Sequence, residues 1–128
     1  MVRAAASTFV VLGMHRSGTS ALARSLNILG PRTSDNLMKA NNFNTTGYWE
    51  PKSIVRFNDD VITHFNRLWA DPKPFPDDWI ETTAFSTFAE NAKEVLSVEL
   101  GHSGSVVVKD PRFSRVLPVW RDAISARD

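Results

Sequence analysis

The chain has 128 residues, which fits one ordinary domain, and its 42% hydrophobic and 23% charged residues are usual for a globular protein. A net charge of +1 gives no reason to expect nucleic-acid binding, and no apolar stretch approaches the roughly 20 residues that span a bilayer. The absence of cysteine excludes disulfide frameworks, cysteine-based zinc sites and thiol nucleophiles. We therefore expect a cytoplasmic protein with neither a membrane span nor a nucleic-acid partner.

The first thirty residues have the pattern of a strand, a glycine-rich loop and a helix. Thr8–Leu12 is a short β-branched and apolar run that predicts a strand covered on both faces. Because it leads directly into Gly13, we do not interpret it as the core of a signal peptide. Thr19–Leu29 predicts a helix that ends at Gly30, and this order is typical of the opening of an α/β nucleotide-binding unit. The leucines of this helix share one face: Leu22, Leu26 and Leu29.

The middle of the chain predicts a polar loop and two helices. Residues 31–47 are rich in Asn, Thr and Ser, which is typical of a surface loop. Apolar residues recur at helical spacing from Pro51 to about Ala70, and again from Trp79 to Leu100. The three prolines between these segments predict a connection. We expect the following aromatic residues to lie in the core: Phe57, Phe65, Trp69, Phe85 and Phe88.

The C-terminal part predicts a second buried strand, Val106–Val108, followed by an amphipathic segment from Phe113. Pro118 in that segment is tolerable only in a first helical turn or at a kink. We therefore expect an α/β fold with a parallel sheet flanked by helices, as in P-loop NTPases. Two parallel strands do not make a self-sufficient sheet. We expect residues 1–128 to be the N-terminal half of a larger domain, able to self-associate through an exposed sheet edge.

The residues between the first strand and the first helix form a Gly-x4-Gly loop, Gly13–Gly18. Such a loop presents backbone N–H groups to an anion at a helix N-terminus. The Lys that follows the second glycine in a Walker A loop is Thr19 here, and the cation is Arg16 inside the loop. Phosphoryl transfer generally needs Mg²⁺ and that Lys. A sulfonate carries one fewer negative charge, so the loop favours a sulfonate donor and no metal.

Three segments resemble a known family. Phe9–Ser20 (FVVLGMHRSGTS) resembles the 5′-phosphosulfate-binding loop of the sulfotransferases, in the bacterial form that has Arg where cytosolic enzymes use Lys. Gly47–Glu50 (GYWE) and Val106–Arg112 (VVVKDPR) resemble further segments of that subgroup. The resemblance covers the whole chain and about half of a typical member. It implies a P-loop-like fold, 3′-phosphoadenosine 5′-phosphosulfate (PAPS) as donor, and in-line sulfonate transfer to a hydroxyl or amine.

The same resemblance implies roles for the loop. Arg16 would stabilise charge on the leaving phosphate oxygen. His15 either titrates in the reaction, orients the loop or packs. The residues that would hold the donor's 5′-phosphate end are Gly13, His15, Arg16, Ser17, Gly18, Thr19 and Ser20. Family members also place an Arg, and a Ser eight residues after it, on the donor's 3′-phosphate, and no Arg of this chain has a Ser at that spacing.

Transfer to a hydroxyl needs a base near the acceptor. Glu50 is the first candidate, since some family members have a catalytic Glu at this distance from the loop; otherwise it faces a helix N-terminus as a dipole partner. Asp110 is the rival base, or a turn residue before a proline. Lys109 would reach the sulfonate oxygens. Arg112 either binds an anion or caps the following helix.

Two other functions fit parts of the sequence. The chain could be a P-loop kinase or nucleotide hydrolase, because Val106–Asp110 imitates the strand and Asp that hold Mg²⁺, although the missing Lys after Gly18 argues against it. It could also be a truncated nucleotide-binding fragment without catalytic activity. Tyr48 and Trp49 are candidates for an acceptor wall. The acceptor itself stays open.

Overall fold

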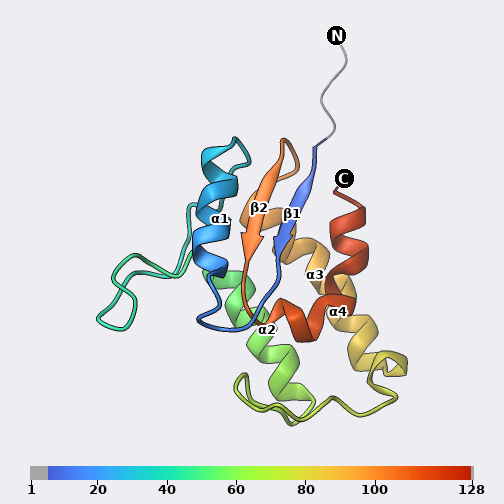
Figure 1. Ribbon diagram of the computed structural model, residues 1–128. Coiled ribbons are helices and arrows are strands. Elements are labelled where there is room, and N and C mark those ends of the chain that lie inside the picture. Colours follow the sequence, from blue (N-terminus) through green and yellow to red (C-terminus); the bar gives the residue numbers. More distant parts are fainter. Residues whose placement is uncertain (1–5, 128) are drawn as a thin grey trace.

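Two parallel strands and four α-helices make up residues 6–127, which a computed structural model describes (Figure 1). A short 3₁₀ helix, Trp79–Glu81, precedes the third α-helix. The α/β class is therefore confirmed. The elements in chain order are β1 (Thr8–Val11), α1 (Thr19–Ile28), α2 (Lys52–His64), α3 (Thr83–Leu100), β2 (Val106–Lys109) and α4 (Phe113–Ser125).

The sheet places β2 in the middle. β1 pairs with it in parallel, from Thr8 opposite Val106 to Val11 opposite Lys109. On the other side of β2, the backbone of Arg32 forms an isolated bridge: its N–H donates to the Ser105 carbonyl at 2.9 Å. The predicted buried strand Val106–Val108 is confirmed, and β2 extends one residue farther, to Lys109, which is buried as well.

β1 lies at the edge of this sheet and was wrongly predicted to be covered on both faces. Val11 is its one buried residue, and Phe9 is 40% exposed. β1 pairs with one strand only, β2, and its other edge is unpaired. A strand at the edge of a sheet buries less of its apolar surface than a central strand does.

Helices cover the two faces of the sheet, with α1 on one and α2, α3 and α4 on the other (Figure 1). The alternating side chains of β2 divide between these layers. Val106 and Val108 belong to the main core, together with Leu96 of α3 and Trp120 of α4. Val107 faces the opposite way, into a smaller cluster with Val11 and Ala23 of α1.

Only Leu26 of the predicted leucine face of α1 packs on the sheet, beside Ala23. Ala23 is 2% exposed, whereas Leu22 and Leu29 are 51% and 80% exposed. A small side chain at the contact lets the helix axis approach the strands closely. Periodicity alone cannot choose this face, because the leucines are more apolar than the alanine.

Two predicted helix boundaries were wrong. α2 ends at His64 instead of near Ala70, and Asn66 follows with a left-handed φ of 54°, which Asn tolerates better than most residues. The segment predicted to be helical from Trp79 is interrupted at Thr82, whose side chain accepts a hydrogen bond from the Phe85 N–H and caps α3.

α4 continues through Pro118, which lies well inside the helix. Proline has no N–H to donate and its ring crowds the preceding turn, so a helix bends there. Figure 1 shows α4 changing direction along its length, in agreement with the expected kink. Within residues 6–127, no helix is both long and apolar enough to cross a membrane.

Candidate functional site

The loop between β1 and α1 folds back tightly on itself. Gly18, immediately before α1, has φ 86°, and Arg16 has φ 62°, so two left-handed residues alternate with ordinary ones. Such alternation turns successive backbone N–H groups toward a common point, which suits an anion. Gly13 has no room for a side chain, because a Cβ there would lie 2.7 Å from Cγ2 of Thr19. The Ser17 hydroxyl closes the loop by donating to the Met14 carbonyl at 2.5 Å.

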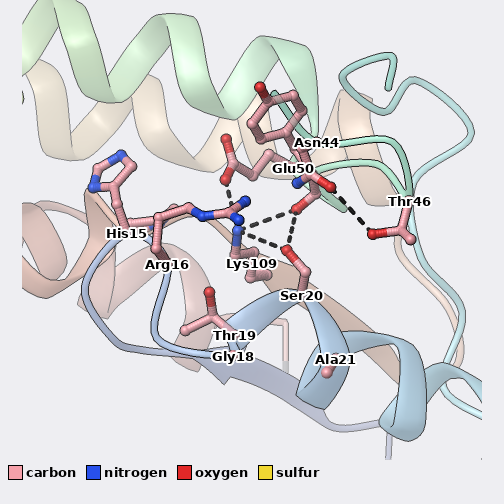
Figure 2. Close-up of a pocket in the computed structure, with 12 residues that line it drawn as sticks. His15, Arg16, Gly18, Thr19, Ser20, Ala21, Asn44, Thr46, Glu50 and Lys109 are labelled. Atoms are coloured by element: carbon pink, nitrogen blue, oxygen red, sulfur yellow. Dashed lines mark hydrogen bonds and ion pairs between the residues drawn. The ribbon is translucent and has the colours of Figure 1, made fainter. Parts of the chain in front are cut away.

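A cavity of about 290 Å³ opens where this loop meets the C-terminal ends of the two strands (Figure 2). The start of α1 forms one wall, and the segment from Asn44 to Glu50 forms another. Most of the residues in the described lining have polar side chains. The lining residues are His15, Arg16, Gly18, Thr19, Ser20, Ala21, Asn44, Thr46, Tyr48, Glu50, Lys109 and Pro111.

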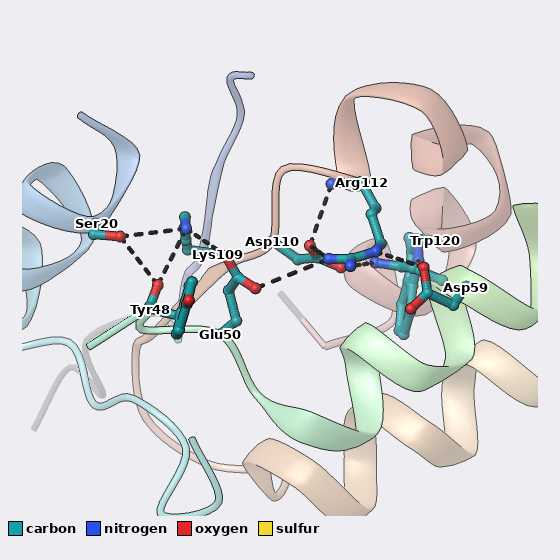
Figure 3. A network of polar contacts seen from close by, with 9 residues as sticks. Ser20, Tyr48, Glu50, Asp59, Lys109, Asp110, Arg112 and Trp120 are labelled. Carbon is teal, nitrogen blue, oxygen red and sulfur yellow. Dashed lines mark hydrogen bonds and ion pairs between the residues drawn. The ribbon is translucent and has the colours of Figure 1, made fainter. Parts of the chain in front are cut away.

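Lys109, the last residue of β2, connects the two walls of the cavity. Its Nζ donates to Oε1 of Glu50 at 2.6 Å, to the Tyr48 carbonyl at 3.1 Å and to the Ser20 hydroxyl at 3.3 Å (Figures 2 and 3). All three donor positions of the ammonium are therefore used, although Lys109 is only 4% exposed. The Ser20 hydroxyl also donates to the Tyr48 carbonyl, at 3.1 Å.

Glu50 is a buried carboxylate that lies close to two cations, Lys109 and Arg112. Burial raises its pKa above the ordinary value, and the hydrogen bond and charge of Lys109 oppose that rise without cancelling it. Arg112 lies farther off, with its NH1 3.9 Å from Oε2 of Glu50. A carboxylate with a raised pKa, facing a cavity, has the properties of a general base.

Asp110 follows Lys109 but belongs to a different cluster, on the core side of the sheet (Figure 3). Its Oδ1 accepts from NH1 of Arg112 at 2.8 Å, and its Oδ2 accepts from Nδ2 of Asn58 at 2.8 Å. The indole N–H of Trp120 donates to Oδ1 of Asn58 at 2.7 Å. Asp110 is fully buried and does not line the cavity. This arrangement suits a structural anchor better than a base.

Arg112 joins the two clusters. Its Nε donates to Oδ1 of Asp59 at 2.6 Å, in addition to its bond with Asp110. Burial by itself would lower the pKa of Arg112, but the carboxylates of Asp110 and Asp59 outweigh it and raise that pKa. The side chain of Arg112 does not cap α4, although the residue lies at the N-terminus of that helix; the guanidinium is held by the carboxylates of Asp59 and Asp110.

A contact between two tilted aromatic rings links Arg112 to the loop. The rings of His15 and Trp69 have centroids 4.6 Å apart, and the Arg112 guanidinium lies 5.9 Å from the Trp69 ring centre. Trp69 is 51% exposed, so its predicted place in the core was wrong. Burial, followed by the positive charge of Arg112, lowers the pKa of His15. Both effects favour the neutral form of the ring.

Most of the predicted site residues meet at this cavity. His15, Arg16, Gly18, Thr19, Ser20, Glu50 and Lys109 line it, while Gly13, Ser17 and Asp110 do not. Sequence reasoning did not single out Asn44, Thr46 or the core residues Asn58 and Trp120. Asn58 had a recognisable signal, because it is a polar residue on the apolar face of a helix that carries Val55 and Ile62.

Among residues 6–127, no group of three or more His, Asp and Glu side chains is arranged to hold a metal ion. Comparisons of the chain with protein-family models, with curated proteins and with solved structures found no match in any of the three. The function therefore has to be argued from the site itself.

Proposed function

We propose that this chain binds the phosphosulfate end of PAPS at Gly13–Ser20, on a P-loop-like fold, and transfers the sulfonate to an acceptor hydroxyl. The observation that carries the proposal is the position of Lys109. Its ammonium lies between Ser20, at the start of α1, and Glu50 across the cavity, and Arg16 lines the same space. One cavity thus holds a phosphate loop, two cations and one carboxylate.

These groups have separate tasks in such a reaction. The N-terminus of α1, with Thr19 and Ser20, binds the 5′-phosphate. Lys109 and Arg16 compensate charge on the sulfonate and on the leaving oxygen. The acceptor oxygen forms a bond to sulfur while the bond from sulfur to the bridging phosphate oxygen breaks. Glu50 takes the acceptor's proton and later releases it to solvent.

The position of Asp110 weighs against phosphoryl transfer with a metal. In a P-loop kinase or nucleotide hydrolase the acid after the second strand faces the nucleotide and holds Mg²⁺. Here both oxygens of that acid are bonded to Arg112 and Asn58 in the core. The cation that such enzymes place after the second glycine is also replaced, by Thr19.

Calorimetric titration of the purified chain separates the two functions. We expect 3′-phosphoadenosine 5′-phosphate, the product of the donor, to bind without a divalent cation, and Arg16→Ala to weaken that binding. The matched control is Arg24→Ala, an exposed residue of α1 outside the cavity. Binding of ATP that requires Mg²⁺ would contradict the proposal. Incubation with PAPS and a mixture of acceptors then tests transfer itself.

A further inference from the structure

The part of the cavity opposite the phosphate loop is built from uncharged polar side chains. Asn44 and Thr46 line it, together with Tyr48 (Figure 2). These residues belong to a projecting polar segment between α1 and α2 (Figure 1). Since the loop side would hold the donor, this segment is where an acceptor meets Glu50.

The lining restricts what the acceptor can be. Ligand pockets are ordinarily lined by apolar and aromatic side chains with a few polar groups. Here Leu, Ile, Val, Met and Phe are all missing from the described lining, and Ala21 and Pro111 are its aliphatic members. A lipid or an apolar phenol would leave the amide and hydroxyl groups without hydrogen bonds, which costs binding energy.

Charge restricts the acceptor further. Arg16 and Lys109 line the cavity against a single carboxylate, Glu50, which Lys109 already neutralises. A protonated amine would find no unpaired carboxylate in the described lining, because Glu50 is already bonded to Lys109. A neutral molecule with several hydroxyl groups meets no such penalty.

The side chain of Asn44 is oriented for such a molecule. Its Oδ1 accepts from the Thr46 hydroxyl at 3.1 Å, while no hydrogen bond joins its Nδ2 to another described residue. Asn41 fixes the segment, because its Oδ1 accepts from the Tyr48 hydroxyl at 2.9 Å and from the Asn44 N–H at 3.1 Å. Two amide N–H donors are thus held at the cavity in a fixed place.

We propose that the acceptor is a neutral carbohydrate, and that Asn44 and Thr46 select it by hydrogen bonding to hydroxyl groups next to the one that reacts. This inference rests on the proposed sulfonate transfer. A site built to hydrogen-bond a substrate hydroxyl discriminates strongly against analogues that lack it.

The test is a two-dimensional ¹H–¹⁵N NMR titration of the whole chain. Backbone signals of Gly18, Thr19 and Ser20 report addition of 3′-phosphoadenosine 5′-phosphate. The Asn44 side-chain amide and the Thr46 backbone signal then report three neutral sugars: cellobiose, maltose and methyl mannoside. We expect at least one sugar to move the Asn44 and Thr46 signals saturably, and 4-nitrophenol and ethanolamine to leave them unmoved.

Variants check that the hydrogen bonds matter. Asn44→Ala is expected to raise the sugar's Kd about tenfold, as the loss of about one net hydrogen bond predicts. Asn42→Ala, an exposed neighbour outside the cavity, should leave it unchanged. Thr46→Val provides a second variant if Asn44→Ala does not fold.

The outcomes separate the two proposals. If the nucleotide moves no signal in Gly18–Ser20, the donor proposal is wrong, and the sugar titration still reports on the acceptor side. If the nucleotide binds but none of the three sugars moves Asn44 or Thr46, the carbohydrate inference is wrong. The same holds if 4-nitrophenol or ethanolamine moves those signals instead, or if Asn44→Ala binds sugar as tightly as the parent.

Discussion

Lys109 and Asp110 are neighbours in the chain, yet they serve two regions with different physical character (Figure 3). Lys109 extends to the cavity side, where its partners Glu50 and Ser20 belong to a site open to ligand. Asp110 extends to the core side, where Asn58 and Arg112 use both of its oxygens. The alternation of side chains along an extended backbone separates them.

This comparison shows why two charged residues at one strand end do not share a function. In the cavity, a ligand can replace or join the existing contacts, so the groups there are available for chemistry. In the core cluster, both carboxylate oxygens of Asp110 already accept hydrogen bonds, so its contribution is to stability. Arg112, which contacts both Asp110 and Glu50, is the physical connection between the two regions.

The largest expected effect is on the core side. Asp110→Ala would remove the fully buried carboxylate that pairs with Arg112, leaving Arg112 only Asp59 at hydrogen-bond distance, and would leave the Asn58 amide without its partner. Breaking a buried charge pair in this way costs about 3–5 kcal/mol. Urea denaturation of the variant measures this loss. Asp122→Ala, an exposed control on α4, should change the free energy of unfolding by less than about 0.5 kcal/mol. Equal effects for the two variants would contradict the anchoring role.

On the cavity side, Arg16→Ala should affect transfer and leave the fold intact. Losing one group that stabilises transition-state charge lowers the rate about 10²–10³-fold, or about 2.7–4 kcal/mol. The assay is sulfonate transfer from PAPS, with the urea midpoint measured alongside to show an unchanged fold. Transfer within about tenfold of the parent would remove Arg16 from the mechanism.

Trp120→Phe sharpens the comparison from the far end of the core cluster. It keeps most of the aromatic ring packing but deprives Oδ1 of Asn58 of its buried donor. An unsatisfied buried acceptor costs about 1–3 kcal/mol. Thermal and urea unfolding should show this loss, while binding of 3′-phosphoadenosine 5′-phosphate stays unchanged. If Trp120→Phe loses nucleotide binding but keeps the stability of the parent, the assignment of this cluster to stability and of the cavity to binding would be wrong.

The smallest effect is a pH dependence of stability that arises at His15. Because its pKa is lower in the folded chain than the ordinary 6.5, the unfolded chain binds the proton more readily. As pH falls from 6.5 toward the folded-state pKa, the parent should lose stability, by at most about 1.4 kcal/mol per pH unit. His15→Gln should not show the part of this loss that His15 causes. The measurement is the free energy of unfolding of parent and variant between about pH 7.5 and pH 5, and a constant difference between the two over this range would contradict the role of His15.

Much of the local structure followed from the sequence. The strand, glycine loop and helix over Thr8–Ile28, and the end of α3 at Gly101, depend on residues close in sequence. The loop was recognised as an anion site from its glycines and its cation, and Glu50 was assigned to the same site because the resemblance to sulfotransferases implies a catalytic Glu at that distance from the loop. Their meeting at one cavity agrees with that expectation.

Other features were wrong or missing for identifiable reasons. The end of α2 was placed near Ala70 because apolar spacing continues beyond His64, whereas Asn66 reverses the backbone. Trp69 was assigned to the core by its size and spacing, but its half-exposed ring lies against the His15 ring instead, tilted by 48°. Both errors arise because a periodic pattern does not report which neighbour a side chain will meet.

The sequence by itself determined the features that depend on nearest neighbours: the glycine loop, the presence and order of the helices, and the buried strand over Val106–Val108. Only the tertiary structure decided which polar residues share an environment. It brought Lys109 to Glu50 across 59 positions of the chain and Asp110 to Asn58 across 52. The physical reason is that local propensity is set by adjacent residues, whereas burial and charge pairing depend on packing between elements far apart in the chain.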